Sequence, residues 1–218
     1  MQLPHCHRNG DVIISYRHNF IFIRTRKTAS STIEAVLTPC LRPKDIYVEG
    51  VHFRGGDQSP YPGFERGIQH MTAAQMKTLV SPEFWNNCFR FTAERHPYEK
   101  AVSLAYYRCG RSVEKNRPNV PFEHMLDKVI RAGNYGSYKY YTIAGQLAAH
   151  DFIRHETLKS DLERIGTKFG IEIPSELPRK KGNYRKDPRP AREILSEQQK
   201  RTVYETCREE FELLAYAP

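Results

Sequence analysis

Short apolar runs alternate with longer amphipathic stretches along this chain. The four apolar residues at 20–23 form a run that is too short for a helix and rich in strand formers. Such a run predicts a strand that is buried on both faces, as in a parallel sheet. The same reasoning predicts further strands at 11–16, 45–49, 88–93 and 152–153, and the first of these is expected to form a hairpin with 20–23 at the edge of the sheet.

Amphipathic stretches between these strands predict helices. In the stretch 121–132, Phe122, Met125, Leu126 and Val129 share one face. Thr72 with Gln75, and Ser196 with Gln199, have the spacing of a capping box. Helices are expected from the end of the 25–32 loop to about residue 38, and at 72–80, 82–87, 121–132, 158–169 and 196–214, with polar loops at 51–68, 108–121 and 171–192. Strands that alternate with helices predict one α/β domain over 1–218, with a mainly parallel sheet between helices.

The first strand-to-helix junction, TRKTASST at 25–32, carries candidate chemistry. A helix N-terminus presents unpaired N–H groups and a partial positive charge, which suit a phosphate. The junction adds two cations and several hydroxyls, and its candidate ligand-binding residues are Arg26, Lys27, Thr28, Ala29, Ser30, Ser31 and Thr32. Because it contains no glycine, it does not match the glycine-rich phosphate loop of nucleotide-binding proteins. The alternative is an ordinary turn with a surface lysine.

A second junction repeats this design in the segment FRFTAERHPYEKAVSLAYY. The strand ends near Arg95, and Pro97 suits the first position of a helix. Arg95 offers a fork of donors for a phosphate, and Ser103 adds a hydroxyl about two turns into the helix. The alternative is an arginine that caps a strand and a serine that faces the core. Both junctions lie at the carboxyl ends of strands, where open α/β sheets bind their ligands.

Together these segments resemble PAPS-dependent sulfotransferases. TRKTASST is similar to the 5′-phosphosulfate loop of the carbohydrate 2-O-sulfotransferase branch, and RHPYEKAVS to the family's 3′-phosphate motif. DFIRHETLKSDLERI and the last helix also resemble the family, so the likeness runs from about Asn19 to Tyr216. Arg26 departs from it, because the family often has proline there. The resemblance implies a three-layer fold like that of P-loop kinases, with PAPS as donor and PAP as product.

The resemblance also implies roles for particular residues. Lys27 would neutralise the leaving 5′-phosphate, and Arg95 and Ser103 would bind the 3′-phosphate. No metal is required, because cations of the loop can meet the charge of a monophosphate leaving group. KKGN in the basic segment 179–192 resembles the family's cofactor loops and suggests Lys181, Gly182 and Asn183 as ligands. The alternative for this segment is a solvated basic loop.

An acceptor hydroxyl needs a base to take its proton, and His70 is the first candidate. It lies between the two phosphate segments, just before a capped helix, where the resembled branch carries a histidine base. Glu49 and His52 are the rivals, and Glu34 is a weaker one. The tyrosines at 135, 138, 140 and 141 suit either stacking on a sugar or base, or packing in the core. The expected acceptor is a hydroxyl of a glycan or glycoconjugate.

Composition narrows the choice of partner and compartment. The formal net charge of +9 suits an anionic partner. A P-loop kinase is the rival enzyme, but it would need a glycine-rich loop and a carboxylate for Mg²⁺. A nucleic-acid-binding protein is the rival binding function, but no helix-turn-helix, zinc or RNP pattern occurs. Five widely spaced cysteines, no secretory signal and no apolar run of membrane-spanning length lead us to expect a cytoplasmic protein.

Overall fold

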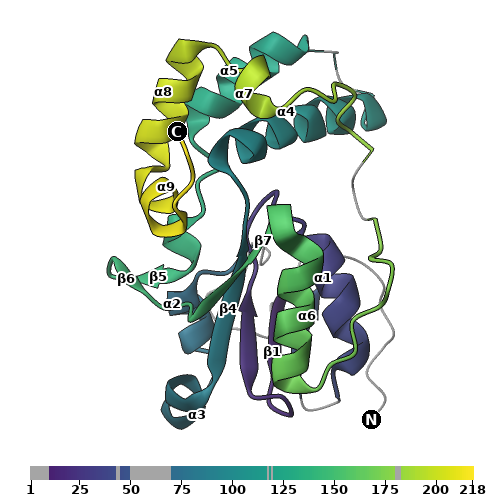
Figure 1. Ribbon diagram of the computed structural model, residues 1–218, viewed down its shortest axis with the longest axis vertical. Helices are drawn as coiled ribbons and strands as arrows, with labels where there is room; N and C mark the ends of the chain where they lie inside the picture. The colour runs from purple at the N-terminus through teal and green to yellow at the C-terminus, as the bar shows by residue number, and fades with distance from the viewer. Residues whose placement is uncertain (1–9, 43–44, 50–69, 117, 119, 180–182) are drawn as a thin grey trace, which may run out of the picture.

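The structure is a computed structural model of the chain, and it describes residues 10–42, 45–49, 70–116, 118, 120–179 and 183–218. Its centre is a five-stranded sheet in the order β3-β1-β2-β4-β7 (Figure 1). The strands are β1 Gly10–Ser15, β2 Phe20–Ile23, β3 Ile46–Glu49, β4 Phe89–Glu94 and β7 Asp151–Arg154. β2, β4 and β7 pair in parallel, and β1 runs antiparallel to both β2 and β3. The sheet is therefore mainly parallel, as the sequence predicts.

Helices cover both faces of this sheet, and the side-chain alternation of β2 decides which face each helix takes. Phe20 and Phe22 pack toward α1 and α6, whereas Ile21 and Ile23 pack toward α2 and α3. Figure 1 shows α1 and α6 on one side of the strands, with α2 and α3 on the other. The helices are α1 Ser30–Leu37, α2 Ala73–Lys77, α3 Pro82–Asn87 and α6 Leu158–Phe169. The mainly parallel sheet between helices confirms the α/β class.

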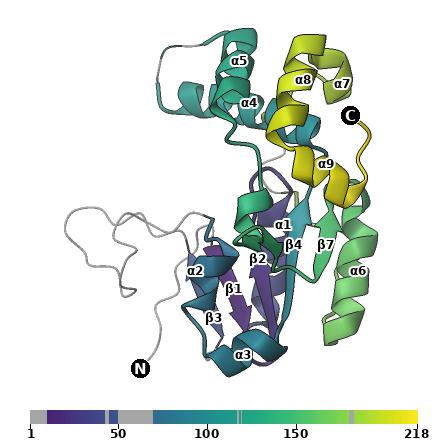
Figure 2. The ribbon, with the colours of Figure 1, turned by 90° about the vertical axis from the view of Figure 1, so that its left-hand side faces the viewer.

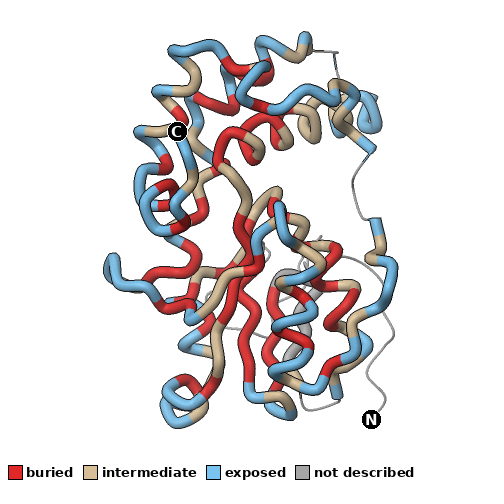
Figure 3. The backbone as a smooth tube through the Cα atoms, in the orientation of Figure 1, coloured by how far each residue is buried: buried red, intermediate tan, exposed pale blue. Residues whose placement is uncertain are grey.

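A group of helices lies beyond the carboxyl ends of the parallel strands (Figures 1 and 2). It comprises α4 Pro97–Glu114, α5 Phe122–Ala132, α7 Ala191–Ile194, α8 Glu197–Thr206 and α9 Arg208–Leu214. These helices share their own apolar cluster, in which Val102, Leu126 and Val203 are buried. Figure 3 shows buried backbone along the strands and on the inner sides of these helices. Because α4 begins three residues after β4 ends, this group reaches directly over the edge where the two segments predicted to bind phosphate lie.

Several predicted element boundaries are wrong. The predicted loop at 108–121 is helical to Glu114, because α4 continues through Gly110, where the Tyr184 ring occupies the space that a Cβ would take. The predicted single helix at 196–214 is broken at Cys207, whose φ of −122° separates α8 from α9. The hairpin of β1 with β2 is confirmed, but β3 occupies the sheet edge beyond it.

Short elements complete the regular secondary structure of the described residues. The capping boxes at Thr72 and Ser196 are confirmed, each with its Gln side chain bonded back to the cap. A two-stranded hairpin that the sequence pattern did not predict lies beside α2. The short elements are 3₁₀ turns at Thr38–Cys40 (η1), Tyr138–Tyr140 (η2) and His155–Thr157 (η3), and strands β5 Thr142–Ile143 and β6 Gln146–Leu147.

Candidate functional site

The loop after β2 turns through two left-handed residues without glycine. Lys27 has φ 61° and Ala29 has φ 65°, a region that residues with a Cβ rarely adopt. Side-chain hydrogen bonds hold this turn. The Thr28 and Ser30 hydroxyls donate to the Thr25 carbonyl oxygen at 3.3 and 2.6 Å, and the Thr25 hydroxyl donates to the Ala93 carbonyl of β4. The predicted hydroxyl donors therefore fold the loop and are buried within it.

The N–H groups at the start of α1 are left for another partner. The first N–H groups of a helix have no acceptor within the helix. Here the N-cap residue is Ala29, which supplies no side-chain acceptor, and the first turn contains no acidic residue. Alanine is among the poorest N-cap residues. The Thr32 N–H already donates to the Ala29 carbonyl oxygen at 2.8 Å. This eight-residue helix thus presents the N–H groups of Ser30 and Ser31, which the Ala29 side chain cannot cap, and the positive end of its dipole at the carboxyl edge of the sheet.

Arg24 and Glu34 form a buried ion pair beneath this loop. Arg24 Nη1 lies 2.8 Å from Glu34 Oε2, and both side chains are less than a tenth exposed. Arg24 Nη2 also donates to the Ser31 hydroxyl at 2.9 Å. The remaining predicted hydroxyl, that of Thr32, donates to the Pro178 carbonyl oxygen at 2.9 Å. Glu34 is therefore part of the loop's support, and it is poorly placed to act as a base.

The two cations of the loop face helix α4. The Lys27 Nζ atom lies 4.4 Å from the centroid of the Tyr107 ring, which is a cation–π distance. Burial lowers the pKa of Arg108, and the nearby charge of Arg26 lowers it further. The first predicted phosphate segment therefore lies against the helix that carries the second one.

The second segment places Arg95 and Ser103 along one side of α4. Arg95 follows β4 directly, and its Nη2 lies 2.9 Å from Glu99 Oε2. Burial lowers the pKa of Arg95, and Glu99 opposes that shift. The Arg95 Nε atom is buried and has no hydrogen-bond partner among the described residues. Ser103 is half-buried and, at helical spacing, shares its side of α4 with Glu99 and Tyr107.

A buried ionic cluster anchors this segment from behind. Lys100 Nζ lies 2.7 Å from Glu94 Oε2 and 3.7 Å from Glu210 Oε1, with all three side chains at most 1% exposed. Glu210 Oε1 also accepts the Ser137 N–H at 2.6 Å. Burial raises the pKa of Glu94 despite the ammonium. Burial lowers the pKa of Lys100, but the two carboxylates outweigh it and hold that pKa above its ordinary value. The cluster joins β4, α4 and α9.

The basic segment docks on α4 just after its predicted ligands. Lys181 and Gly182 lie outside the described residues, and Asn183 is exposed. Tyr184 packs edge-on against the Tyr107 ring at 5.2 Å, and its hydroxyl donates to Glu114 at 2.8 Å. The part of this segment that follows Asn183 is therefore packed, in contrast to a fully solvated loop.

The predicted base, His70, follows a different part of the chain from the loop after β2, and one of its rivals lies outside the described residues. His70 has φ 58° and is half-buried, with its ring 6.0 Å from that of Tyr140. The next residue, Met71, packs with Ile21 and Ile23 on the face of β2 that is opposite α1. His52 lies outside the described residues, and Glu49 is the last residue of β3. Tyr135, Tyr140 and Tyr141 are buried in the core, which favours the packing alternative for the tyrosines.

Sequence reasoning missed three neighbours of Arg95 and Lys27, namely Glu99, Tyr107 and His155. Burial and the nearby Arg95 charge lower the pKa of His155 to about 4, so its imidazole is neutral at pH 7. His155 follows β7 as Arg95 follows β4, and these strands pair in register at Glu94 and Arg154. The spacing of Arg95, Glu99, Ser103 and Tyr107 by four residues was the available signal for the first two.

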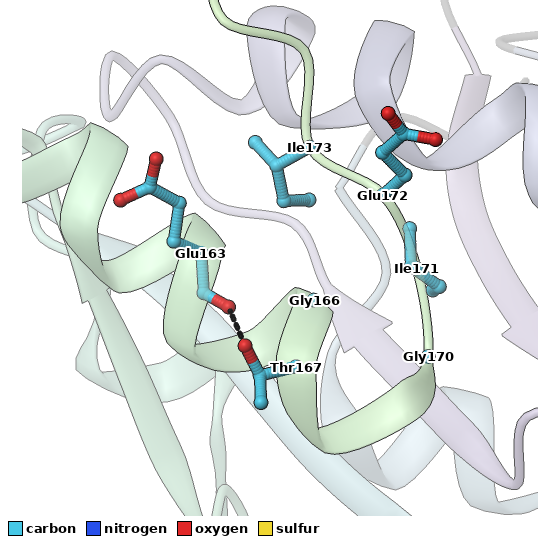
Figure 4. A pocket seen from close by; sticks show the side chains of 7 residues that line it. All are labelled: Glu163, Gly166, Thr167, Gly170, Ile171, Glu172 and Ile173. Carbon is cyan, nitrogen blue, oxygen red and sulfur yellow. Dashed lines mark hydrogen bonds between the residues drawn. The ribbon is translucent and has the colours of Figure 1, made fainter.

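Two cavities occur away from these residues. One, of about 280 Å³, is lined by the C-terminal half of α6 and the chain that follows it, including Glu163, Ile171 and Ile173 (Figure 4). Within it the Thr167 hydroxyl donates to the Glu163 carbonyl oxygen at 2.9 Å. The other, of about 290 Å³, lies between Tyr98, Arg192 and helix α8. Neither is lined by the loop after β2.

Comparisons of the whole chain with protein-family profiles, curated proteins and solved structures find no match. Within the described ranges, no three His, Cys, Asp or Glu side chains gather in a way that suits a metal ion. The described helices also include none with the length and apolar character needed to cross a membrane. The functional interpretation of the site therefore depends on the chemistry and positions of its own residues.

Proposed function

We propose that this protein is a PAPS-dependent O-sulfotransferase with a fold like that of P-loop kinases. It would move a sulfuryl group from PAPS to an acceptor hydroxyl and release PAP. The observation that carries the proposal is the contact of Lys27 with Tyr107. That contact joins the loop after β2 to the helix after β4, and these parallel strands are neighbours in the sheet. This closeness supports the proposal that the two segments resembling the family's phosphate motifs form one site.

The chemistry of this site suits a nucleotide with two phosphate groups. The uncapped N-terminus of α1 and Lys27 offer donors and positive charge for the 5′ end. Arg95 and Ser103 offer a guanidinium and a hydroxyl for the 3′-phosphate, and the buried Nε of Arg95 is a donor that still lacks a partner in the described chain. A nucleotide without a 3′-phosphate would leave this second group of donors unused.

Transfer of the sulfuryl group would follow an in-line course. The acceptor oxygen forms a bond to sulfur as the bond from sulfur to the 5′-phosphate oxygen breaks. Lys27 neutralises the charge that develops on this leaving oxygen, which is the kind of stabilisation that accelerates group transfer most. The acceptor proton passes to a base, for which we retain His70 with Glu49 and His52 as rivals. A glycan hydroxyl is the acceptor we propose.

Binding measurements test the proposal directly. We expect adenosine 3′,5′-bisphosphate to bind at least about tenfold more tightly than adenosine 5′-phosphate, because one charge-assisted hydrogen bond contributes about 1.5–3 kcal/mol. Arg95→Ala should remove this preference. Equal affinity for the two nucleotides would overturn the proposal. Tighter binding of Mg²⁺-ATP would support the kinase, and tighter binding of a single-stranded oligonucleotide would support a nucleic-acid-binding protein.

The acceptor is tested separately. Labelled PAPS is incubated with the protein and a panel of glycans, and matched small hydroxyl compounds serve as a second panel. We expect label on a glycan. Transfer to small hydroxyl compounds alone would keep the sulfotransferase proposal and overturn the glycan acceptor.

A further inference from the structure

Glu99 gathers donors from three separate parts of the chain. Its Oε2 atom lies 2.9 Å from Arg95 Nη2 and 2.5 Å from Arg185 Nη1. Its Oε1 atom accepts the Ala191 N–H at 2.7 Å. These partners come from the end of β4, the basic segment and the start of α7. One half-buried carboxylate therefore connects the proposed 3′-phosphate residue to the C-terminal part of the chain.

The second arginine in this group is held in a fixed position. Arg185 Nε donates to the Asp187 carbonyl oxygen at 2.9 Å, and its Nη2 donates to the carbonyl of Arg189. Its remaining arm is the one that contacts Glu99. With Arg185 bonded on all three sides and Ala191 bonded to the other oxygen, the Glu99 carboxylate has little freedom to rotate. The Arg95 guanidinium is bonded to a fixed acceptor.

The donors of this group favour an anion. Two guanidinium groups contact the Glu99 carboxylate, the charge of Glu156 also acts on Arg95, and the buried Nε of Arg95 remains a donor without a partner among the described residues. Burial raises the pKa of Glu99, but its hydrogen bonds and the two arginines outweigh this and leave that pKa below its ordinary value. Arg185 also lowers the pKa of Arg95, which is the expected effect of two cations held close together. Without Glu99 the two arginines would repel each other.

We propose that Glu99 is a positioning residue for the second anion subsite, where it holds Arg95 and Arg185 side by side to receive the nucleotide's 3′-phosphate. This inference rests on the proposed function. A positioning role and a purely electrostatic role for Glu99 predict opposite changes in anion affinity when Glu99 is removed. If Glu99 acted through its charge alone, its removal would strengthen anion binding. If it positions the arginines, its removal weakens binding of the 3′-phosphate although the net positive charge rises.

The test compares Glu99→Gln with the unmodified protein. Affinities for adenosine 3′,5′-bisphosphate and adenosine 5′-phosphate are measured by calorimetry, and their ratio reports the 3′-phosphate alone. We expect the ratio to fall about tenfold in Glu99→Gln, since at least one charge-assisted hydrogen bond is lost. Glu99→Asp keeps the charge on a shorter side chain and should give an intermediate ratio. Glu99→Gln combined with Arg95→Ala should lose no more than Arg95→Ala alone.

A measurement without nucleotide checks the same contact. Trypsin needs the free side chain of Arg185 to cut after it, so cleavage there should be faster in Glu99→Gln, while cleavage after the exposed Arg179 should be unchanged. The inference would be overturned if the unmodified protein prefers the bisphosphate and the Glu99→Gln variant shows an equal or greater preference. Equal cleavage rates after Arg185 would also overturn it. An unmodified protein without any preference would overturn the proposed function instead.

Discussion

Lys27 and Tyr107 join the two halves of the candidate site, with the lysine Nζ atom 4.4 Å from the ring centroid. Lys27 belongs to the loop after β2, and Tyr107 lies in the third turn of α4. A half-exposed cation–π contact contributes about 0.5–1 kcal/mol. A contact of this size helps to orient the lysine side chain.

Lys27→Ala should therefore abolish most sulfuryl transfer and change the stability of the fold little. We expect kcat to fall about 10²–10³-fold, as when one donor to a developing oxyanion is removed. Tyr107→Phe keeps an aromatic ring under the lysine and is the matched control, with nearly normal turnover. Steady-state kinetics and thermal unfolding measure the two effects. A loss of more than about 2 kcal/mol of unfolding free energy in Lys27→Ala would make the lysine structural.

His70→Ala tests the base. A general base contributes about 10²–10⁴-fold to a reaction, so kcat should fall by that factor. Affinity for the bisphosphate should stay normal, because His70 lies on the face of the sheet that carries α2, away from α1. Glu49→Gln and His52→Ala are measured in parallel. If either abolishes turnover while His70→Ala retains more than about a third of it, the base lies at the end of β3 or just after it.

Lys100→Met should be severely destabilising. The substitution leaves Glu94 and Glu210 buried without their ammonium partner, and breaking a buried ion pair costs about 3–5 kcal/mol. Urea unfolding measures this loss. Lys159→Met is the matched control, since its pair with Glu163 is exposed and should contribute about 0–1 kcal/mol. A Lys100→Met protein of normal stability would show that the two carboxylates do not need the ammonium.

The effect of Gly110→Ala on the stability of the fold should depend on which residue is present at position 184. Alanine in a helix is favoured over glycine by about 1 kcal/mol. At this position, however, the new Cβ would overlap the Tyr184 ring. Gly110→Ala should therefore destabilise the protein that has Tyr184 and stabilise the Tyr184→Ala variant, as measured by thermal unfolding. The same sign in both backgrounds would show that Tyr184 does not pack there in solution.

His155 should make the protein less stable in mild acid. Its folded pKa of about 4 lies below the ordinary value of 6.5, so between these values the unfolded chain binds more protons. The free energy of unfolding should fall as pH is lowered through this window, and the contribution of His155 is complete above it. His155→Asn should flatten this dependence when urea unfolding is compared at about pH 7 and about pH 5.

Two controls accompany the His155 measurement. His124→Asn changes an exposed residue of α5 and should leave the pH dependence as it is. Part of the slope should survive in His155→Asn, because burial also lowers the pKa of His96 and His150. If His124→Asn flattens the pH dependence of the unfolding free energy as much as His155→Asn does, the low pKa of His155 is not the cause of the loss of stability in mild acid.

The sequence predicted those parts of the fold that depend on local patterns. The apolar run of β2 and the capping boxes at Thr72 and Ser196 were readable, because each depends on residues within one turn or one strand. The continuation of α4 through Gly110 was not readable. A glycine inside a helix is unfavourable by itself, and the reason for it here is Tyr184, which is distant in the chain and fills the space that a Cβ would take.

The candidate site divides in the same way. The positions of Lys27 and Arg95 after parallel strands followed from the order of the elements. The order of the elements did not predict that the Thr28 and Ser30 hydroxyls point into the loop, because this depends on their hydrogen bonds to the Thr25 carbonyl oxygen. The bridging role of Glu99 also required the structure, since Arg185 reaches it from the far end of the chain.

The left-handed conformations of Lys27 and Ala29 bear on how related loops can be recognised. In most phosphate loops glycine supplies positive φ, and searches by motif depend on finding it. Here hydroxyl groups inside the turn maintain that conformation, at a cost of about 1–3 kcal/mol for each such residue. A search for glycine-rich loops would overlook this site. The site would be found by a search for two left-handed residues between a strand and a helix that are flanked by a threonine and a serine, as Lys27 and Ala29 are flanked by Thr25 and Ser30.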